Sequence, residues 1–149
     1  MAAGLTAAGG AGLARTLGPH QAMGLYAHLG WITKDREWSI RERDVAGIVA
    51  AFRAAADRTR VRVHAVAVLA EHVHLMVSYP PSARLSDFVR DAKSESARRV
   101  NLTRTARQRR LRWCRGCYAN AVCRGHLSTL RAYLARQRQH HPDRLPLAG

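Results

Sequence analysis

The chain has 149 residues, of which 47% are hydrophobic, so it is long enough for one globular domain whose core needs no disulfide or structural metal. No apolar run approaches the roughly 20 residues that cross a bilayer, which excludes a membrane-spanning protein. The 25 Lys and Arg residues against 10 Asp and Glu give a formal net charge of +15, which favours a polyanionic partner.

The first 22 residues differ from the rest of the chain, because Ala, Gly and Leu dominate them without strand alternation or a helical stripe. Gly9-Gly10 and Gly18-Pro19 interrupt the continuous apolar stretch that a secretory signal requires. We therefore expect a disordered leader over 1–22, a single domain over 23–149 and a cytoplasmic location. Met23 is an alternative start of the protein.

Apolar periodicity predicts seven elements after the leader. Strands are predicted over 25–33, 61–70 and 72–79, a final strand or hairpin over 111–122, and helices over 41–58, 85–100 and 126–139. Ser39 with Glu42 three residues later has the pattern of a capping box at the first helix. The order β-α-β-β-α-β-α predicts an α+β domain: a ferredoxin-like, mainly antiparallel sheet with two helices on one face, followed by a C-terminal helix.

Arginine is concentrated in the second half of the chain, where no acid occurs between Glu95 and Asp143. The arginines of this span are Arg98, Arg99, Arg104, Arg107, Arg109, Arg110, Arg112, Arg115, Arg124, Arg131, Arg136 and Arg138. Codon usage in a GC-rich genome is an alternative explanation for Arg over Lys, but it does not explain the missing acids. Because phosphate contacts dominate affinity for nucleic acids, we expect a nucleic-acid partner.

Three cysteines, Cys114, Cys117 and Cys123, lie in one short stretch. Their odd number and the lack of a secretory signal indicate reduced thiols in a cytoplasm. The spacing Cys-x2-Cys-x5-Cys-x2-His126 also allows interpretation as a zinc site. Strand alternation across this segment would splay those ligands apart, which argues against zinc.

His72 and His74 are two residues apart in a predicted strand, so both side chains emerge on one face. Val73, Leu75 and Val77 then point the opposite way, into a core under the helices. Two neutral imidazoles so placed can share one divalent cation. The alternative is a half-exposed pair on a sheet surface, which we favour for an isolated His-x-His motif.

Tyr133 and Gln137 are four residues apart in the predicted last helix, hence neighbours on one face. They flank the apolar stripe of Leu127, Leu130 and Leu134, which leaves the Tyr133 hydroxyl free to reach a neighbouring surface. A tyrosine can form a covalent intermediate when its hydroxyl is activated, and an amide oxygen is a suitable ligand for Mg²⁺ or Mn²⁺. The alternative is an ordinary tyrosine at the edge of an amphipathic core.

Five segments carry further motifs in a fixed order: LYAHLGWITKDR, AVLAEHVHLMVSYPP, SDFVRDAKSESARRVN, LRWCRGCYANAV and LRAYLARQRQHH. They hold, in turn, an aromatic-His strand with Thr-Lys-x-Arg, a His-hydrophobe-His motif, Lys-x-x-Ser, Trp with Gly-x-Tyr, and Tyr-hydrophobe-x-x-Gln. The chain from residue 25 to about 141 thereby resembles the single-tyrosine HUH transposases of the smallest prokaryotic insertion sequences and the REP-associated tyrosine transposases. Five segments in order are far more specific than any one of them.

The resemblance implies that His72 and His74 are metal ligands, with Gln137 as a third, for Mg²⁺ or Mn²⁺. It implies that Tyr133 is the nucleophile, which attacks single-stranded DNA, forms a 5′-phosphotyrosine link and releases a 3′-hydroxyl. It also implies recognition of DNA hairpins at element ends. The expected assembly is a homodimer in which each tyrosine helix completes the partner's histidine site.

The residues that we expect to contact DNA are Lys93, Arg98, Arg99, Arg104, Arg107, Arg109, Arg110, Arg112 and Arg115. One alternative function is a domesticated or non-cleaving protein of the same fold that binds DNA hairpins. The intact set of His72, His74, Tyr133 and Gln137 argues against it. A second alternative, a zinc-stabilised RNA-binding protein, rests on the cysteines and the charge alone.

Overall fold

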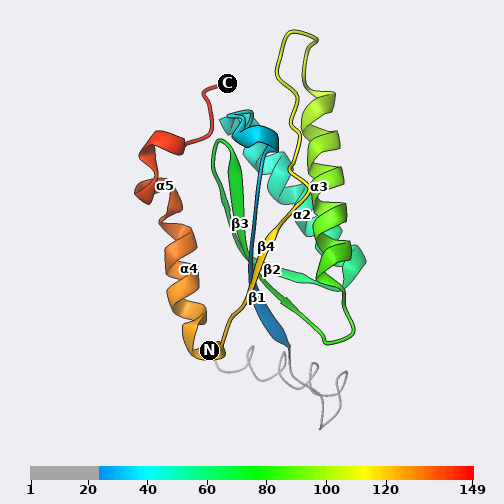
Figure 1. The fold of residues 1–149 in the computed structure, drawn as a ribbon, viewed down its shortest axis with the longest axis vertical. Coiled ribbons are helices and arrows are strands. Elements are labelled where there is room, and N and C mark those ends of the chain that lie inside the picture. The colour runs from blue at the N-terminus through cyan, green and yellow to red at the C-terminus, as the bar shows by residue number, and fades with distance from the viewer. Residues whose placement is uncertain (1–23) are drawn as a thin grey trace, which may run out of the picture.

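An antiparallel sheet with helices on both faces forms the centre of the protein in the computed structural model, which describes residues 24–149 (Figure 1). Its strands are β1 (Leu25–Ile32), β2 (Arg62–Val68), β3 (His72–Tyr79) and β4 (Tyr118–Ala121). They lie in the order β2-β3-β1-β4, and each neighbouring pair is antiparallel. The predicted α+β class and antiparallel sheet are confirmed. The leader expected over 1–22 lies outside the described residues.

The helices cover the two faces of the sheet unequally. On one face lie α2 (Val45–Thr59) and α3 (Leu85–Leu102), which pack against each other (Figure 1). On the other face lie α4 (Leu127–Ala135) and the short α5 (Gln137–His140). Short 3-10 turns span Lys34–Arg36, Glu42–Asp44, Arg124–His126 and Pro142–Arg144. Among residues 24–149, no helix combines the length and apolarity needed to cross a membrane.

The main core lies between the sheet and the pair α2 and α3. Leu29, Val73 and Leu75 point into it from β1 and β3, and Phe52 and Phe88 fill it from the two helices. All five side chains are fully buried. Because side chains alternate along a strand, this arrangement sends His72 and His74 to the opposite face, as the sequence predicts.

A smaller apolar cluster holds α4 against the opposite face of the sheet. It consists of Ala67, Met76 and Leu134, with Leu127 and Leu130 partly buried against it. The predicted apolar stripe of the last helix therefore does pack down onto the protein.

The predicted capping box at the first helix is wrong. The backbone N–H of Arg41 donates to Asp44 Oδ2 at 2.8 Å, and the N–H of Asp44 donates to the carbonyl of Arg41 at 2.9 Å. The hydroxyl of Ser39 is buried and donates to the carbonyl of Glu37 instead. Asp44, two residues after the predicted Glu42, thus supplies the side-chain bond to the backbone, and α2 begins at Val45 rather than near residue 41.

The segment 111–122 forms a much shorter strand than predicted, from Tyr118 to Ala121, with an isolated bridge between Trp113 and Thr33. The reason is Lys93 of α3. Its ammonium donates to the carbonyls of Cys114, Arg115 and Gly116 at 2.8, 3.1 and 2.7 Å. A side chain from another element therefore takes the acceptors that a continuous ladder would use.

The predicted helix over 126–139 is broken at Arg136. The backbone there has φ −96° and ψ 1°, outside helical geometry, and its N–H is shared between the carbonyls of Ala132 and Tyr133. The first part, α4, carries Tyr133, and Gln137 begins the second part, α5.

Candidate active site

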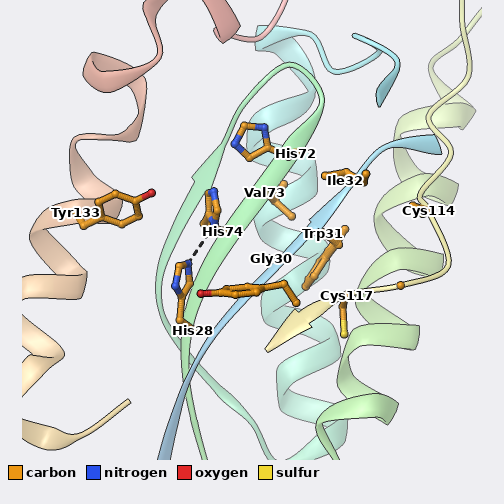
Figure 2. Close-up of a pocket in the computed structure, with 12 residues that line it drawn as sticks. His28, Gly30, Trp31, Ile32, His72, Val73, His74, Cys114, Cys117 and Tyr133 are labelled. Carbon is orange, nitrogen blue, oxygen red and sulfur yellow. Dashed lines mark hydrogen bonds between the residues drawn. The ribbon is translucent and has the colours of Figure 1, made fainter. Parts of the chain in front are cut away.

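A cavity of about 510 Å³ opens on the sheet face that carries the histidines (Figure 2). Strand β1 contributes His28 and Gly30, β3 contributes His72 and His74, β4 contributes Tyr118, and α4 contributes Tyr133. Segments more than 100 residues apart thus meet here, and the predicted histidines and tyrosine line one space.

Gly30 makes room for the imidazole of His74. In the sheet register Gly30 lies opposite His74 on one side and Tyr118 on the other. A Cβ atom at Gly30 would lie 3.2 Å from both His74 Nδ1 and the carbonyl oxygen of Val73. Most Cβ atoms in proteins keep a longer distance from their neighbours than 3.2 Å. The glycine, which has no Cβ, therefore leaves the space that the His74 ring occupies.

Nδ1 of each histidine of β3 lies close to a polar atom of another side chain. His72 Nδ1 lies 2.9 Å from Glu71 Oε1, and His74 Nδ1 lies 3.1 Å from His28 Nε2. The ring centroids of His72 and His74 are 5.0 Å apart. Within the described part of the chain, no hydrogen bond engages Nε2 of either ring, so both Nε2 atoms are available to a ligand.

Burial favours the neutral form of these imidazoles. It lowers the pKa of His74 from the ordinary 6.5 to about 4, with further lowering by the charges of His72, His28 and His141. Burial also lowers the pKa of His72, against the opposing effect of Glu71. A neutral imidazole is the form that can bind a cation.

Tyr133 faces the histidine pair from α4. Its ring centroid lies 6.4 Å from that of His74 and 6.3 Å from that of His28. Figure 2 shows its hydroxyl end directed toward the histidines, and the residue is 44% exposed. Burial of the neighbouring Leu134 fixes the helix, while the tyrosine keeps access to solvent.

Gln137 is fully buried but does not line the cavity. Its side-chain oxygen Oε1 accepts no hydrogen bond from any residue of the described chain, and its Nε2 makes only a long contact of 3.5 Å to the carbonyl of Tyr133. A buried acceptor without a partner costs about 1–3 kcal/mol. A cation near Gln137 would satisfy this oxygen.

The cysteines do not form a zinc site. Cys114, Cys117 and Cys123 are all free thiols. Across residues 24–149, no group of three or more His, Cys, Asp or Glu side chains is arranged to hold a metal ion. The alternative interpretation of the Cys-x2-Cys-x5-Cys-x2-His126 spacing as a zinc site therefore finds no support in the geometry of residues 24–149.

Two of the basic residues expected to contact DNA are occupied within the protein. The guanidinium of Arg104 has no exposed surface, because it pairs with both carboxylate oxygens of Asp44 and donates to the carbonyl of Ser39. Lys93 uses its three donors on the 114–116 loop. The Arg104 side chain is therefore absent from the surface, and the donors of Lys93 are engaged within the protein.

The other expected contacts lie at the surface. Arg98 and Arg99 pair with Glu95, and Arg109 and Arg112 pair with Glu37. Surface pairs of this kind contribute little to stability, so phosphate can replace the carboxylate partner. Three further arginines, Arg107, Arg110 and Arg115, are exposed as well.

Sequence reasoning assigned no role to three residues that shape the site: His28, Gly30 and Glu71. His28 and Gly30 alternate on β1, but their placement beside His74 depends on the pairing register of β1 with β3. Glu71 directly precedes His72, and this adjacency was the only available signal.

Comparison with known proteins agrees with the geometry. A structure of a Deinococcus radiodurans R1 protein assigned as a transposase is similar, with a TM-score of 0.62 at 23% identity over 80% of this chain and 95% of that one. A REP-associated tyrosine transposase bound to a REP hairpin is similar with a TM-score of 0.64 at 14% identity, over 83% of this chain and 72% of that one. At these identities the two structures support the fold alone. No match was found among curated proteins.

The family comparison covers most of the chain. The model of the family described as "Transposase IS200 like" matches residues 21–137, which include every part of the cavity described above. The chain therefore belongs to the IS200-like transposase family.

Proposed function

We propose that this protein is a metal-dependent transposase that nicks and rejoins single-stranded DNA through Tyr133. The observation that carries the proposal is the meeting of Tyr133 with His72 and His74 in one cavity, in a chain of the IS200-like transposase family. Both imidazoles are held through Nδ1, and both have pKa values lowered by burial.

The metal ligands in this proposal are Nε2 of His72, Nε2 of His74 and Oε1 of Gln137. The donor set fits Mg²⁺ or Mn²⁺, because the described chain gives the Gln137 oxygen no hydrogen-bond partner and leaves both imidazole nitrogens available. A cation bound there would polarise the scissile phosphate and stabilise the charge that develops on it.

The residues of the chain perform the transfer itself. The Tyr133 oxygen attacks phosphorus and loses its proton to solvent, a new P–O bond forms, and the bond to the 3′ oxygen breaks. The leaving 3′ oxygen takes a proton and becomes a free 3′-hydroxyl, while the 5′ side stays linked to tyrosine. Because the phosphotyrosine link keeps the phosphodiester energy, rejoining to another 3′-hydroxyl needs no ATP.

The DNA ligand in this proposal is a hairpin with a single-stranded flank. A structural relative is described as bound to a REP hairpin, which supports this ligand class. The surface that we assign to phosphate contacts comprises Arg98, Arg99, Arg107, Arg109, Arg110, Arg112 and Arg115. Such contacts release counterions, so affinity should fall steeply as salt rises.

We further propose a homodimer that can exchange tyrosine helices. In the present structure Tyr133 lies over the histidines of its own chain. Exchange would place it over the partner's pair instead. An equal mixture of His72→Ala and Tyr133→Phe subunits should then regain activity, because one of the two sites contains both a tyrosine and an intact histidine pair. A mixture as inactive as its components would exclude composite sites.

The central experiment tests for the covalent product. A single-stranded oligonucleotide with a hairpin and a label 3′ of the cleavage site should transfer its label to the protein in an SDS-stable form, only with Mg²⁺ or Mn²⁺. Tyr133→Phe removes the attacking oxygen alone and should abolish the product while hairpin binding persists. Tyr118→Phe is the matched control, because Tyr118 lines the same cavity, and it should still form the product.

Two results would contradict the proposed chemistry. Label attached to Tyr118, or to the Tyr133→Phe variant, would show that Tyr133 is not the nucleophile. Tight hairpin binding by the wild type without any covalent product would instead favour the alternative function, a domesticated or non-cleaving hairpin-binding protein of the same fold.

A further inference from the structure

Glu71 is a carboxylate buried almost completely, with 2% of its surface exposed. An isolated carboxylate is very costly to bury, so its partners must account for its place. Oε1 lies 2.9 Å from His72 Nδ1 and accepts a hydrogen bond from a guanidinium nitrogen of Arg144 at 3.1 Å. The other oxygen, Oε2, has no partner among the described residues. Glu71 therefore lies between one residue of the candidate metal site and one residue near the C-terminus.

The 2.9 Å contact with Glu71 Oε1 dictates where His72 carries its proton. An ionised carboxylate can only accept, so Nδ1 of His72 must be the donor. In a neutral imidazole the other nitrogen, Nε2, then keeps its lone pair. A lone pair at Nε2, on the side of the ring away from Glu71, is what a cation in the cavity requires.

The C-terminal segment holds Glu71 in this place. The backbone N–H of Ala70 donates to the carbonyl of Arg144 at 2.8 Å, which ties the residue before Glu71 to the 3-10 turn Pro142–Arg144. The guanidinium of Arg144 adds the ion pair to the carboxylate itself. Arg144, 73 positions from Glu71, thus contacts the same carboxylate oxygen that lies next to His72 Nδ1.

His74 provides an internal contrast. Its Nδ1 faces Nε2 of His28 at 3.1 Å, and an imidazole nitrogen can either donate or accept. The partner of His74 therefore leaves its tautomer open, whereas the partner of His72 does not.

We propose that Glu71, held by Arg144, is a positioning residue that fixes His72 as the Nδ1–H tautomer and directs its Nε2 at the bound cation. The statement about the cation rests on the proposed function, whereas the statement about the tautomer does not. Hydrogen-bond partners of metal-binding histidines typically change metal affinity by about 10–100-fold when they are removed.

The test combines two measurements on the full-length protein at neutral pH. Long-range ¹H–¹⁵N correlation spectra of the metal-free protein report which ring nitrogen of each histidine carries the proton, and calorimetric titration with Mn²⁺ reports affinity. In the wild type His72 should be the Nδ1–H tautomer. Glu71→Gln keeps the shape but its amide can donate, so His72 should shift toward Nε2–H and Mn²⁺ affinity should fall about 10–100-fold. The signals of His74 should stay as in the wild type.

Two further variants separate positioning from a merely structural role. Arg144→Gln keeps the carboxylate and should weaken Mn²⁺ binding by less than Glu71→Gln does. Glu37→Gln is the matched control, because Glu37 also pairs with arginines but contacts neither histidine, and both readouts should remain unchanged. Melting temperatures of all variants identify any loss of fold.

The outcomes distinguish the two proposals. If Glu71→Gln keeps His72 as Nδ1–H and binds Mn²⁺ within twofold of the wild type, the positioning role is refuted. If the wild type binds no Mn²⁺, the proposed metal site is refuted, and the tautomer of His72 in the wild type and in Glu71→Gln then decides alone whether Glu71 sets it.

Discussion

The two faces of the sheet are built from the same strands but are covered very differently. Helices α2 and α3 cover one face (Figure 1). Under them Phe52 and Phe88 are fully buried in one continuous apolar cluster. On the other face a small cluster around Met76 and Leu134 holds α4, and the surface beside it opens into the cavity with the histidines. The first face is closed and apolar, and the second is partly open and polar.

The difference shows that one face of the sheet holds most of the apolar core, whereas the other face holds the candidate site. Leu75 and His74 are neighbours in the chain, yet one is fully buried in the core and the other lines the cavity. The period of two in β3 allows one strand to serve both faces. Changes on the closed face should therefore reduce stability with little effect on the site, and changes on the open face should do the reverse.

The largest expected effect on stability comes from Phe52→Ala. Phe52 is fully buried and packs edge-on against Trp31, with ring centroids 5.2 Å apart. Loss of this side chain should lower the free energy of unfolding by about 3–5 kcal/mol. Urea unfolding followed by circular dichroism measures this value. A loss below about 1 kcal/mol would show that the closed face is not the main source of stability.

A smaller effect is expected for Leu134→Ala on the open face. Leu134 is buried, but its cluster contains few residues, so the loss should be near the lower end of the usual range, about 2 kcal/mol. Because the same helix carries Tyr133, the yield of covalent product should fall more than stability alone explains. If stability falls as far as in Phe52→Ala, the two faces of the sheet contribute equally to stability.

Acidification should lower the free energy of unfolding of the metal-free protein, because histidines on the open face must take up protons. The folded state holds the pKa of His74 at about 4, against 6.5 ordinarily, so between these values the unfolded chain binds more protons. Stability should therefore fall as pH is lowered from about 6.5 toward 4. His74→Gln should reduce this slope, although His28, His64 and His72 have pKa values shifted in the same direction and keep part of it.

The measurement for this prediction is the urea midpoint at several pH values. His126→Gln serves as the matched control, because His126 is exposed and lies outside the cavity. A slope in His74→Gln that equals that of the wild type would remove His74 as a cause of the acid sensitivity.

The smallest effect on stability, with a clear effect on the site, is expected for Gly30→Ala. The added Cβ would lie 3.2 Å from His74 Nδ1, so the imidazole must shift and its hydrogen bond to His28 should weaken. We expect a stability change below about 1 kcal/mol and a loss of Mn²⁺ affinity on the order of 10-fold. Gly47→Ala in α2 is the control, because nothing lies within 4 Å of its added Cβ. Unchanged Mn²⁺ affinity in Gly30→Ala would show that the space at Gly30 does not position His74.

Much of this architecture could be predicted from local patterns in the sequence. The alternation from His72 to Tyr79 placed the two histidines on one face and Val73, Leu75 and Val77 on the other, and the structure agrees. The stripe of the last helix was also predicted correctly. Such patterns succeed because the pleat of a strand and the turn of a helix act within a few residues.

Two of the differences from the prediction originate in contacts from distant segments. Lys93 shortens the last strand, since it takes carbonyls 21 to 23 positions away. Arg104 is removed from the expected DNA surface by Asp44, which is 60 positions away. The charge pattern of the sequence cannot distinguish a buried arginine from an exposed one. Burial of a particular guanidinium depends on the carboxylate that the fold places next to it.

The sequence by itself therefore determined the family motifs, the face on which His72 and His74 lie and the amphipathic helix that carries Tyr133. Only the tertiary structure decided that His28 contacts His74 across 46 positions, and that Arg144 reaches Glu71 across 73. The physical reason is the difference between local and long-range geometry. Periodicity records how the backbone directs neighbouring side chains, whereas the hydrogen bonds that orient the imidazoles depend on strand register and on where the C-terminal segment packs.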